Sequence, residues 1–172
     1  NTRPNIIWIF GDQHRAQAQG HMGDPNVRTP NLDCLGEEGV VFTRAVAGCP
    51  WCSPFRGALL TSRYVHDTTP TTPSALDPSL PTVAEPFNDA GYDTAYFGKW
   101  HLDGPKPETG SARAIVPRER RGGFGTWIGY ENNNNPRYTH VHGHRDDEEV
   151  PQYLLPDFET DALADLLIAY LR

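Results

Sequence analysis

The sequence predicts an α/β fold in which a mostly parallel sheet is flanked by helices. Apolar segments of strand length, at residues 5–10, 40–46 and 92–97, alternate with segments of helical character. Such alternation is typical of parallel sheets whose strands are connected by helices. The first segment is apolar at almost every position, which favours a central strand that is covered on both faces.

Proline and glycine mark the expected helices. Pro30 and Pro54 each stand in what would be a first helical turn, and Thr29 is a candidate N-cap. Acidic residues gather early in the last segment, where the helix dipole favours them. The expected helices cover residues 30–39, 53–63, 81–90 and 157–172.

Residues 103–156 have a different character, with many Pro, Gly, Asn and charged residues. We interpret them as a loop-rich insertion with one short strand near Trp127, inside a single domain over residues 1–172. His140, His142 and His144 stand at alternate positions, and on a strand they would share a face that could bind a transition metal. The favoured interpretation is an exposed loop that leads into an acidic run.

The composition excludes several classes of protein. The chain has 15 Lys and Arg against 22 Asp and Glu, and a net charge of −7, so a nucleic-acid partner is not expected. With 37% hydrophobic residues it is not a disordered chain, and no apolar window has the ~20 residues of a membrane helix. The chain opens on Asn1, so we expect a periplasmic or secreted protein if a leader was removed, and a cytoplasmic one otherwise.

The first candidate site lies at the end of the first expected strand. Asp12 and Gln13 follow it directly, and ligands of open α/β sheets bind at the carboxyl ends of strands. Their side-chain oxygens suit Ca²⁺ or Mg²⁺. An Asx turn or a helix cap is the alternative for Asp12.

The second and third candidate sites hold a thiol and three basic groups. Cys52 stands at the start of an expected helix, where bound anions are favoured, and Arg56 follows one turn later. Cys49 and Cys52 also have the spacing of a dithiol redox pair, and an inert buried cysteine remains an alternative. Lys99 and His101 leave the third expected strand. If that segment is extended, the two side chains lie on the same side, where they can hold an anionic oxygen and donate a proton. The alternative is that both side chains are solvated.

These segments, in this order, resemble the sulfatase family of the alkaline-phosphatase-like superfamily. Cys52-Ser53-Pro54-Phe55-Arg56 is similar to the family's C-x-P-x-R maturation motif, and residues 91–102 are similar to its second signature. The helix start Thr29-Pro30-Asn31-Leu32-Asp33 also resembles a family segment. The similarity is best over residues 4–104.

The resemblance implies a role for each candidate residue. Cys52 would be oxidised to formylglycine, whose hydrate attacks sulfur with one hydroxyl and helps to expel sulfate with the other. Arg56 would orient the diol, Lys99 would bind sulfate, and His101 would contact the formylglycine hydroxyl or support proton transfer. A divalent cation, Ca²⁺ or alternatively Mg²⁺, would be bound by Asp12, Gln13 and the modified Cys52. The implied partners are a formylglycine-generating enzyme and a small sulfate ester or sulfated glycan as substrate.

Two departures from the family pattern affect these expectations. Gln13 stands where many members have a second Asp, which would weaken metal binding. Family members are several times longer, so we expect an N-terminal portion that lacks the later metal ligands and is inactive on its own. The alternatives are a phosphonate monoester or phosphodiester hydrolase of the same superfamily, a thiol redox protein using Cys49 and Cys52, and a non-catalytic binding protein.

Overall fold

The structure, a computed structural model, describes residues 3–172, which divide into two compact units. The first comprises residues 3–47 of the described chain and the second is Gly48–Arg172. Among the residues described, no helix is both long and apolar enough to cross a membrane. The residues of the second expected site and those of the third all fall in the second unit, whereas Asp12 and Gln13 belong to the first.

The first unit contains a short 3-10 helix, η1 (Gly20–Met22), and the helix α1 (Pro30–Glu38). Thr29 Oγ1 accepts a hydrogen bond from the Gly20 amide at 2.8 Å and donates one to Asp33 Oδ1 at 2.9 Å. The Asp33 carboxylate also accepts from the His21 amide at 2.8 Å. The expected helix is confirmed, with Thr29 joining its first turn to η1.

The two apolar segments of this unit do not form the strands that we expected. Residues 5–10 and 40–46 are irregular, and their side chains are exposed, Ile9 by 78% and Phe42 by 79%. A buried strand needs neighbours that pair with its backbone and cover its faces. The described residues of the first unit supply neither, so the prediction of strands here is wrong.

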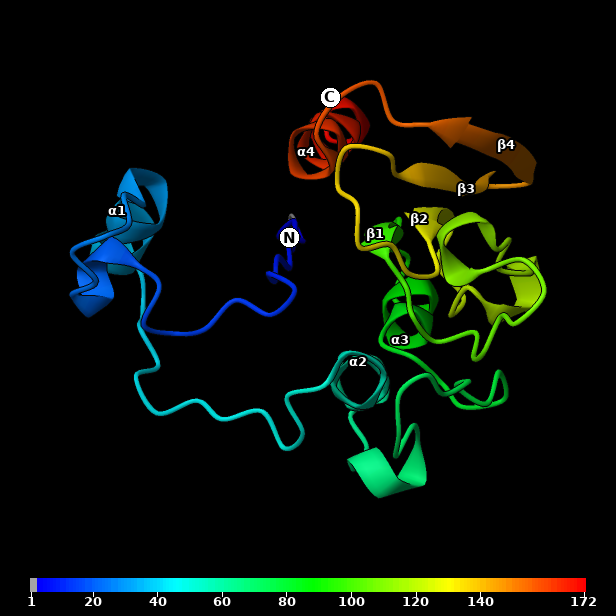
Figure 1. The fold of residues 1–172 in the computed structure, drawn as a ribbon, viewed down its shortest axis with the longest axis horizontal. Helices are drawn as coiled ribbons and strands as arrows, with labels where there is room; N and C mark the ends of the chain where they lie inside the picture. Colours follow the sequence, from blue (N-terminus) through cyan, green and yellow to red (C-terminus); the bar gives the residue numbers. More distant parts are fainter. Residues whose placement is uncertain (1–2) are drawn as a thin grey trace. The chain divides into compact units, whose positions relative to one another are not determined.

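The second unit is built on a four-stranded mixed sheet (Figure 1). Its strands are β1 (Ala95–Lys99), β2 (Thr126–Tyr130), β3 (His140–Arg145) and β4 (Glu148–Leu154), in the order β1-β2-β3-β4. The first pair is parallel and the other two pairs are antiparallel. An α/β sheet is therefore present, but it is mixed and not mostly parallel, because only two residues join β3 to β4 and such a connection reverses the chain.

The strand content of residues 103–156 was underestimated. The segment contains β2, β3 and β4, where one short strand was expected. The two later strands were not predicted because they contain many polar residues. Strand β3 has three histidines, and β4 begins with two glutamates. A strand whose faces carry buried polar side chains loses the alternation of apolar and polar residues on which the prediction depended.

Helices cover both faces of this sheet. They are α2 (Cys52–Thr61), α3 (Ala84–Asp89) and α4 (Glu159–Tyr170), with short 3-10 turns η2 (Val65–Asp67), η3 (Ser111–Arg113) and η4 (Arg118–Arg120). In Figure 1, α4 lies on one side of β1, and α2 and α3 lie on the other. The expected helices are confirmed, although α3 is shorter than predicted and β1 begins three residues later than predicted.

Two apolar cores follow from the alternation of strand side chains. Tyr96 and Trp127 pack on one face with Leu60 of α2 and with Trp100. Ile128 and its neighbours pack on the other face with α4. The start of α4 is fixed by Glu159, whose carboxylate accepts hydrogen bonds from Tyr130 Oη at 2.6 Å and Thr139 Oγ1 at 2.5 Å. Because β1 and β2 pair in parallel, their carboxyl ends lie side by side.

Candidate active site

Cys52 is the first residue of α2, as the sequence predicted. It is half-buried, and Trp51 before it is extended, with its carbonyl accepting the first helical hydrogen bond from the Phe55 amide at 2.8 Å. The first amides of a helix have no partner within the helix, and the dipole places partial positive charge there. Residue 52 therefore stands where a negatively charged group is favoured.

Two threonines, one of them buried, hold this end of α2. Thr69 Oγ1 donates to the Ser53 carbonyl at 2.7 Å, and the hydroxyls of Ser53 and Thr72 are 3.2 Å apart. The contact is so close that a Cβ on Gly57 would lie 2.2 Å from Thr69 Oγ1. Glycine at position 57 is thus required by the approach of the threonine segment, and that approach fixes the direction of the helix.

Arg56 joins α2 to the end of β1. Only 4% of its surface is exposed, and its Nη1 donates to the Lys99 carbonyl at 2.5 Å and to Tyr96 Oη at 3.2 Å. Tyr96 Oη donates to the same carbonyl. A buried guanidinium must be hydrogen-bonded because desolvation of an unpaired charge is costly. The bonds to the Lys99 carbonyl therefore fix both the arginine and the turn that follows β1.

Lys99 completes this group. Its Nζ donates to Cys52 Sγ at 3.5 Å, across two elements that are far apart in the sequence. The structure thus brings together three of the four predicted catalytic residues, Cys52, Arg56 and Lys99. Two cationic side chains beside the start of a helix form a place where a tetrahedral anion, and the charge that develops on it, would be stabilised.

His101 lies just beyond this group, where the chain turns. The Trp100 amide donates to the Tyr130 carbonyl at 2.7 Å and so prolongs the pairing of β1 with β2. His101 then has a φ of 55° and is buried. The extended conformation assumed for residues 99–101 ends at Trp100, and the histidine is placed by a left-handed turn.

Glu131 is a buried carboxylate that the sequence analysis missed. It follows β2 directly, has no exposed surface, and accepts hydrogen bonds from the Asp103 amide at 3.0 Å and 3.2 Å. Burial, together with the charge of Asp103, raises the pKa of Glu131 to about 7, although the amides of Asp103 and Leu102 and the Lys106 ammonium act in the opposite direction. A polar residue at the end of a parallel strand is the signal that would have identified it, had the end of β2 been recognised.

Asp12 and Gln13 lie in an exposed turn of the first unit, and Gln13 has a φ of 57°. Within residues 3–172, no three His, Cys, Asp or Glu side chains are grouped as a metal site would require. Two oxygen donors fall short of the six to eight that Ca²⁺ takes. The residues described here do not by themselves form a calcium site, and no catalytic step is derived from one.

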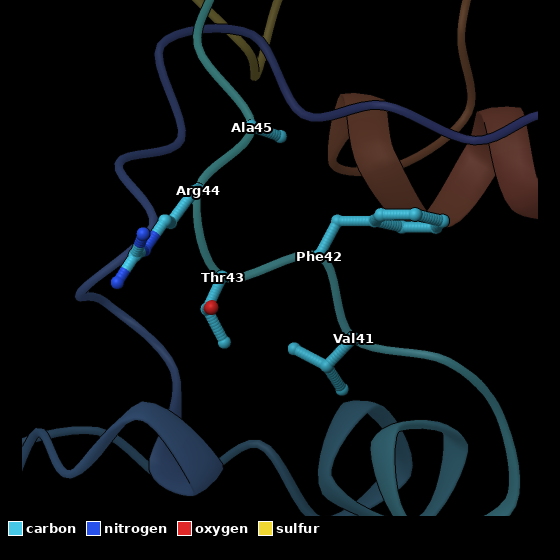
Figure 2. A pocket seen from close by; sticks show the side chains of 5 residues that line it. All are labelled: Val41, Phe42, Thr43, Arg44 and Ala45. Carbon is cyan, nitrogen blue, oxygen red and sulfur yellow. The ribbon is translucent and has the colours of Figure 1, made fainter.

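The pocket in Figure 2 is lined by five consecutive residues, Val41, Phe42, Thr43, Arg44 and Ala45. None of the predicted site residues is among them. Its side chains include no carboxylate, thiol or imidazole. This pocket therefore does not contribute to the candidate site.

The histidines of β3 are not in an exposed loop, so that interpretation was wrong. Both His142 and His144 are buried, and His142 Nε2 accepts a hydrogen bond from the Val116 amide at 2.8 Å. Burial, assisted by the nearby charge of Arg121, lowers the pKa of His142 to about 4. His144 lies 2.8 Å from Arg121 Nη1 through Nδ1 and contacts the Phe124 carbonyl through Nε2. These rings are part of the polar packing of the sheet, and within residues 3–172 they are not grouped with other His, Cys, Asp or Glu side chains as a metal site would require.

The cysteines of the described chain, Cys34, Cys49 and Cys52, are not joined in a disulfide. Cys52 instead contacts Lys99, as described above. The geometry at Cys52 therefore matches the anion site more closely than the dithiol pair.

Comparison with known proteins decides the family. The sulfatase family model matches residues 4–171, almost the whole chain. The chain belongs to the sulfatase family. It is 46% identical to an ulvan-active sulfatase of Formosa agariphila over 136 residues, and 36% identical to an endo-4-O-sulfatase of Bacteroides thetaiotaomicron over 178 residues. The alignments cover 76% and 84% of this chain but only 25% and 35% of those relatives, so this sulfatase chain spans about a third of their length or less.

A solved structure agrees with the family. The crystal structure of a candidate sulfatase, yidJ, from Bacteroides fragilis superposes with a TM-score of 0.81 at 30% identity, covering 92% of this chain and 38% of that one. The predicted α/β class is therefore confirmed as the fold of the sulfatases. The predicted resemblance to the N-terminal portion of a sulfatase is confirmed as well.

Proposed function

We propose that the protein containing this chain is a sulfuric ester hydrolase whose nucleophile is made from Cys52. The observation that carries the proposal is the contact of Lys99 Nζ with Cys52 Sγ, in a Cys52-x-Pro54-x-Arg56 motif whose arginine is locked onto the Lys99 carbonyl. Family membership supports the reaction class. The hydrogen bond from Arg56 to the Lys99 carbonyl brings together two basic residues that are far apart in the sequence.

Each side chain then has a task. Oxidised to formylglycine by a formylglycine-generating enzyme, residue 52 supplies a hydrated aldehyde, whose one hydroxyl attacks sulfur and whose other hydroxyl allows sulfate to leave. Lys99 binds a sulfuryl oxygen and offsets the charge that grows on it. Arg56 orients the nucleophile from within the protein, and His101 transfers a proton at the residue-52 hydroxyl or at the leaving oxygen.

We also propose a divalent cation, Ca²⁺ or alternatively Mg²⁺, as part of the complete site. Asp12, Gln13 and the modified residue 52 would supply part of its oxygen shell, which suits hard cations. The remaining ligands would come from parts of the protein that the relatives have beyond the matched region. Residues 1–172 alone are accordingly proposed to be inactive and poor at binding Ca²⁺.

The proposed substrate is a sulfated glycan or a smaller sulfate ester. One relative is named for activity on ulvan, and another is named an endo-4-O-sulfatase. Lys99 would recognise the sulfate group, which all such substrates share. A phosphonate monoester has a similar tetrahedral anion, so it is the competing substrate that the experiment must include.

The test uses the complete enzyme encoded by the gene, produced together with a formylglycine-generating enzyme. Turnover of 4-nitrophenyl sulfate is compared with that of an aryl phosphonate, and mass spectrometry of the peptide that contains residue 52 reports the modification. We expect sulfate to be the faster substrate and Cys52→Ala to abolish turnover. Faster turnover of the phosphonate, or full activity in Cys52→Ala, would overturn the proposal.

A further inference from the structure

One buried carboxylate has no task in the proposed reaction. Glu131 directly follows the last residue of β2. Because Lys99 pairs with Tyr130, Glu131 lies opposite the residues that follow β1. Both of its oxygens accept hydrogen bonds from the Asp103 amide. The Leu102 amide also stabilises its charged form. The carboxylate thus holds the two backbone amides that follow His101.

The turn at His101 explains what those two hydrogen bonds do. Its φ of 55° is uncommon for a residue with a side chain and costs conformational energy. Successive amides in a turn that includes a left-handed residue form a concavity that binds an anion. Glu131 fills that role from inside the protein, so the strained conformation of His101 is maintained by a carboxylate and not by the chain's own preference.

The charges around Glu131 come from the segment after β1 and from η4. Asp103 opposes ionisation of Glu131, and Lys106 favours it. Asp103 is itself paired with Lys106 Nζ at 2.5 Å and with Arg120 Nε. The two basic side chains therefore offset the repulsion between the carboxylates, and the whole group is anchored on the turn that carries His101.

We propose that Glu131 is a positioning residue whose ionised carboxylate holds the amides after His101 and so keeps that imidazole in one orientation for proton transfer. The inference rests on the proposed function, since it assigns Glu131 to the site at which His101 acts. Glu131 does not touch the substrate. Its loss should therefore lower kcat and leave KM nearly unchanged, because a misplaced catalytic group costs rate without weakening sulfate binding.

The proposed role of Glu131 also predicts that kcat depends on pH. The carboxylate loses its negative charge as the pH falls through about 7, where burial has placed its pKa. A protonated acid is a weaker acceptor for backbone amides than a carboxylate. In the wild-type enzyme, kcat should therefore fall on the acid side of about pH 7, and the backbone amides of Leu102 and Asp103 should change their chemical shifts over the same range.

The experiment compares the complete enzyme with its Glu131→Gln and Glu131→Asp variants, and with Glu108→Gln as the matched control. Glu108 is exposed and lies in the segment between β1 and η3 that also contains Asp103 and Lys106. We expect kcat for 4-nitrophenyl sulfate to fall about 10-fold to 100-fold in Glu131→Gln with KM retained, and the limb near pH 7 to disappear. Glu131→Asp keeps the charge, so its kcat should be higher than that of Glu131→Gln and should still fall on the acid side of its pH profile. Glu108→Gln should behave as the wild type.

A wild-type kcat and pH profile in Glu131→Gln would overturn the proposal. So would a loss of kcat that Glu131→Asp and Glu131→Gln share equally, because that would show a role in packing alone. The amide shifts of the unmutated enzyme give a test that depends on neither folding of a variant nor activity: no titration of Leu102 and Asp103 near pH 7 would contradict the inference. If the wild type hydrolyses no sulfate ester but these amides titrate, the proposed function fails and the coupling of Glu131 to the turn stands.

Discussion

At the scale of single residues, Arg56 shows how one buried side chain can organise a site. Its guanidinium donates from Nη1 to the Lys99 carbonyl and to Tyr96 Oη together, and a lysine side chain lacks this planar group and carries its nitrogen at a different position. The motif arginine therefore acts on the lysine through the backbone as well as through its charge. A conservative exchange to lysine removes the planar guanidinium while it keeps the charge.

We therefore expect Arg56→Lys to lower kcat of the complete enzyme about 100-fold, with the charge preserved, because the turn after β1 loses its anchor. Steady-state kinetics with an aryl sulfate measure the effect. Arg113→Lys, at an exposed position of η3, is the control and should leave kcat unchanged. An unaltered kcat in Arg56→Lys would contradict the role given to the guanidinium.

His142 makes stability depend on pH. Its folded-state pKa of about 4 lies below the ~6.5 of an unfolded chain, so the unfolded state binds more protons between these values. The stability from this residue is complete above about pH 6.5 and is lost as the pH falls toward 4, by up to about 3 kcal/mol. His142→Gln should flatten this dependence in urea unfolding curves, whereas His140→Gln, half-exposed on the same strand, should not. An equally steep dependence in His142→Gln would contradict this account.

At the scale of elements, the site depends on how closely α2 approaches the segment after η2. Thr69 bonds to the Ser53 carbonyl, and Gly57 lies against the same threonine. The closeness of this contact, and not the helix propensity of the sequence, sets the angle at which Cys52 meets Lys99. A substitution that adds one methyl group can test it.

Gly57→Ala should destabilise the protein by about 1–3 kcal/mol, although alanine is the better helix former, because its Cβ would overlap Thr69 Oγ1. Thermal unfolding measures the change. The matched control is Gly36→Ala in α1, where the nearest atoms to a new Cβ lie at an ordinary 3.5 Å. There we expect no loss, and a gain of up to about 1 kcal/mol. A stabilised Gly57→Ala variant would show that the threonine segment yields easily.

At the scale of the whole molecule, the two units differ in how far their apolar side chains are buried. The second unit buries its aromatic and aliphatic side chains in two cores, whereas Ile9, Val40, Phe42 and Val46 of the first remain largely exposed. Contiguous exposed apolar surface is uncommon on soluble proteins. These exposed apolar residues lie in the two segments that were expected to be strands.

Residues 1–172 produced by themselves should consequently bind the dye anilinonaphthalene sulfonate, with a clear rise in fluorescence. Ile9→Ser combined with Phe42→Ser should reduce the signal, because both side chains are exposed apolar groups of these segments. Thr43→Ser serves as the control and should leave it unchanged. Dye binding that is absent, or equal in the double variant, would show that these side chains are covered in solution.

Much of the candidate site could be predicted from the sequence alone. The motif around Cys52, the helix that begins there, the strand that leads to Lys99 and the sulfatase family itself were all identified from residue types and their order, because these signals are local. The predicted roles of Cys52, Arg56, Lys99 and His101 in catalysis, and of Asp12 and Gln13 in metal binding, stay predictions. Glu131 was not predicted as a site residue, because the amides that it binds follow the neighbouring strand β1 and do not belong to its own segment.

The sequence by itself determined the helix starts and the chemistry of the side chains at strand ends, because caps, prolines and motifs act over a few residues. Tertiary structure alone decided which apolar segments became strands, since pairing partners and a cover for each face come from elsewhere in the chain. It also decided that polar segments formed β3 and β4, and that His142 and Glu131 were buried with shifted pKa values. Burial is a property of the whole fold, and desolvation, the largest cause of both shifts, exists only once the chain has packed.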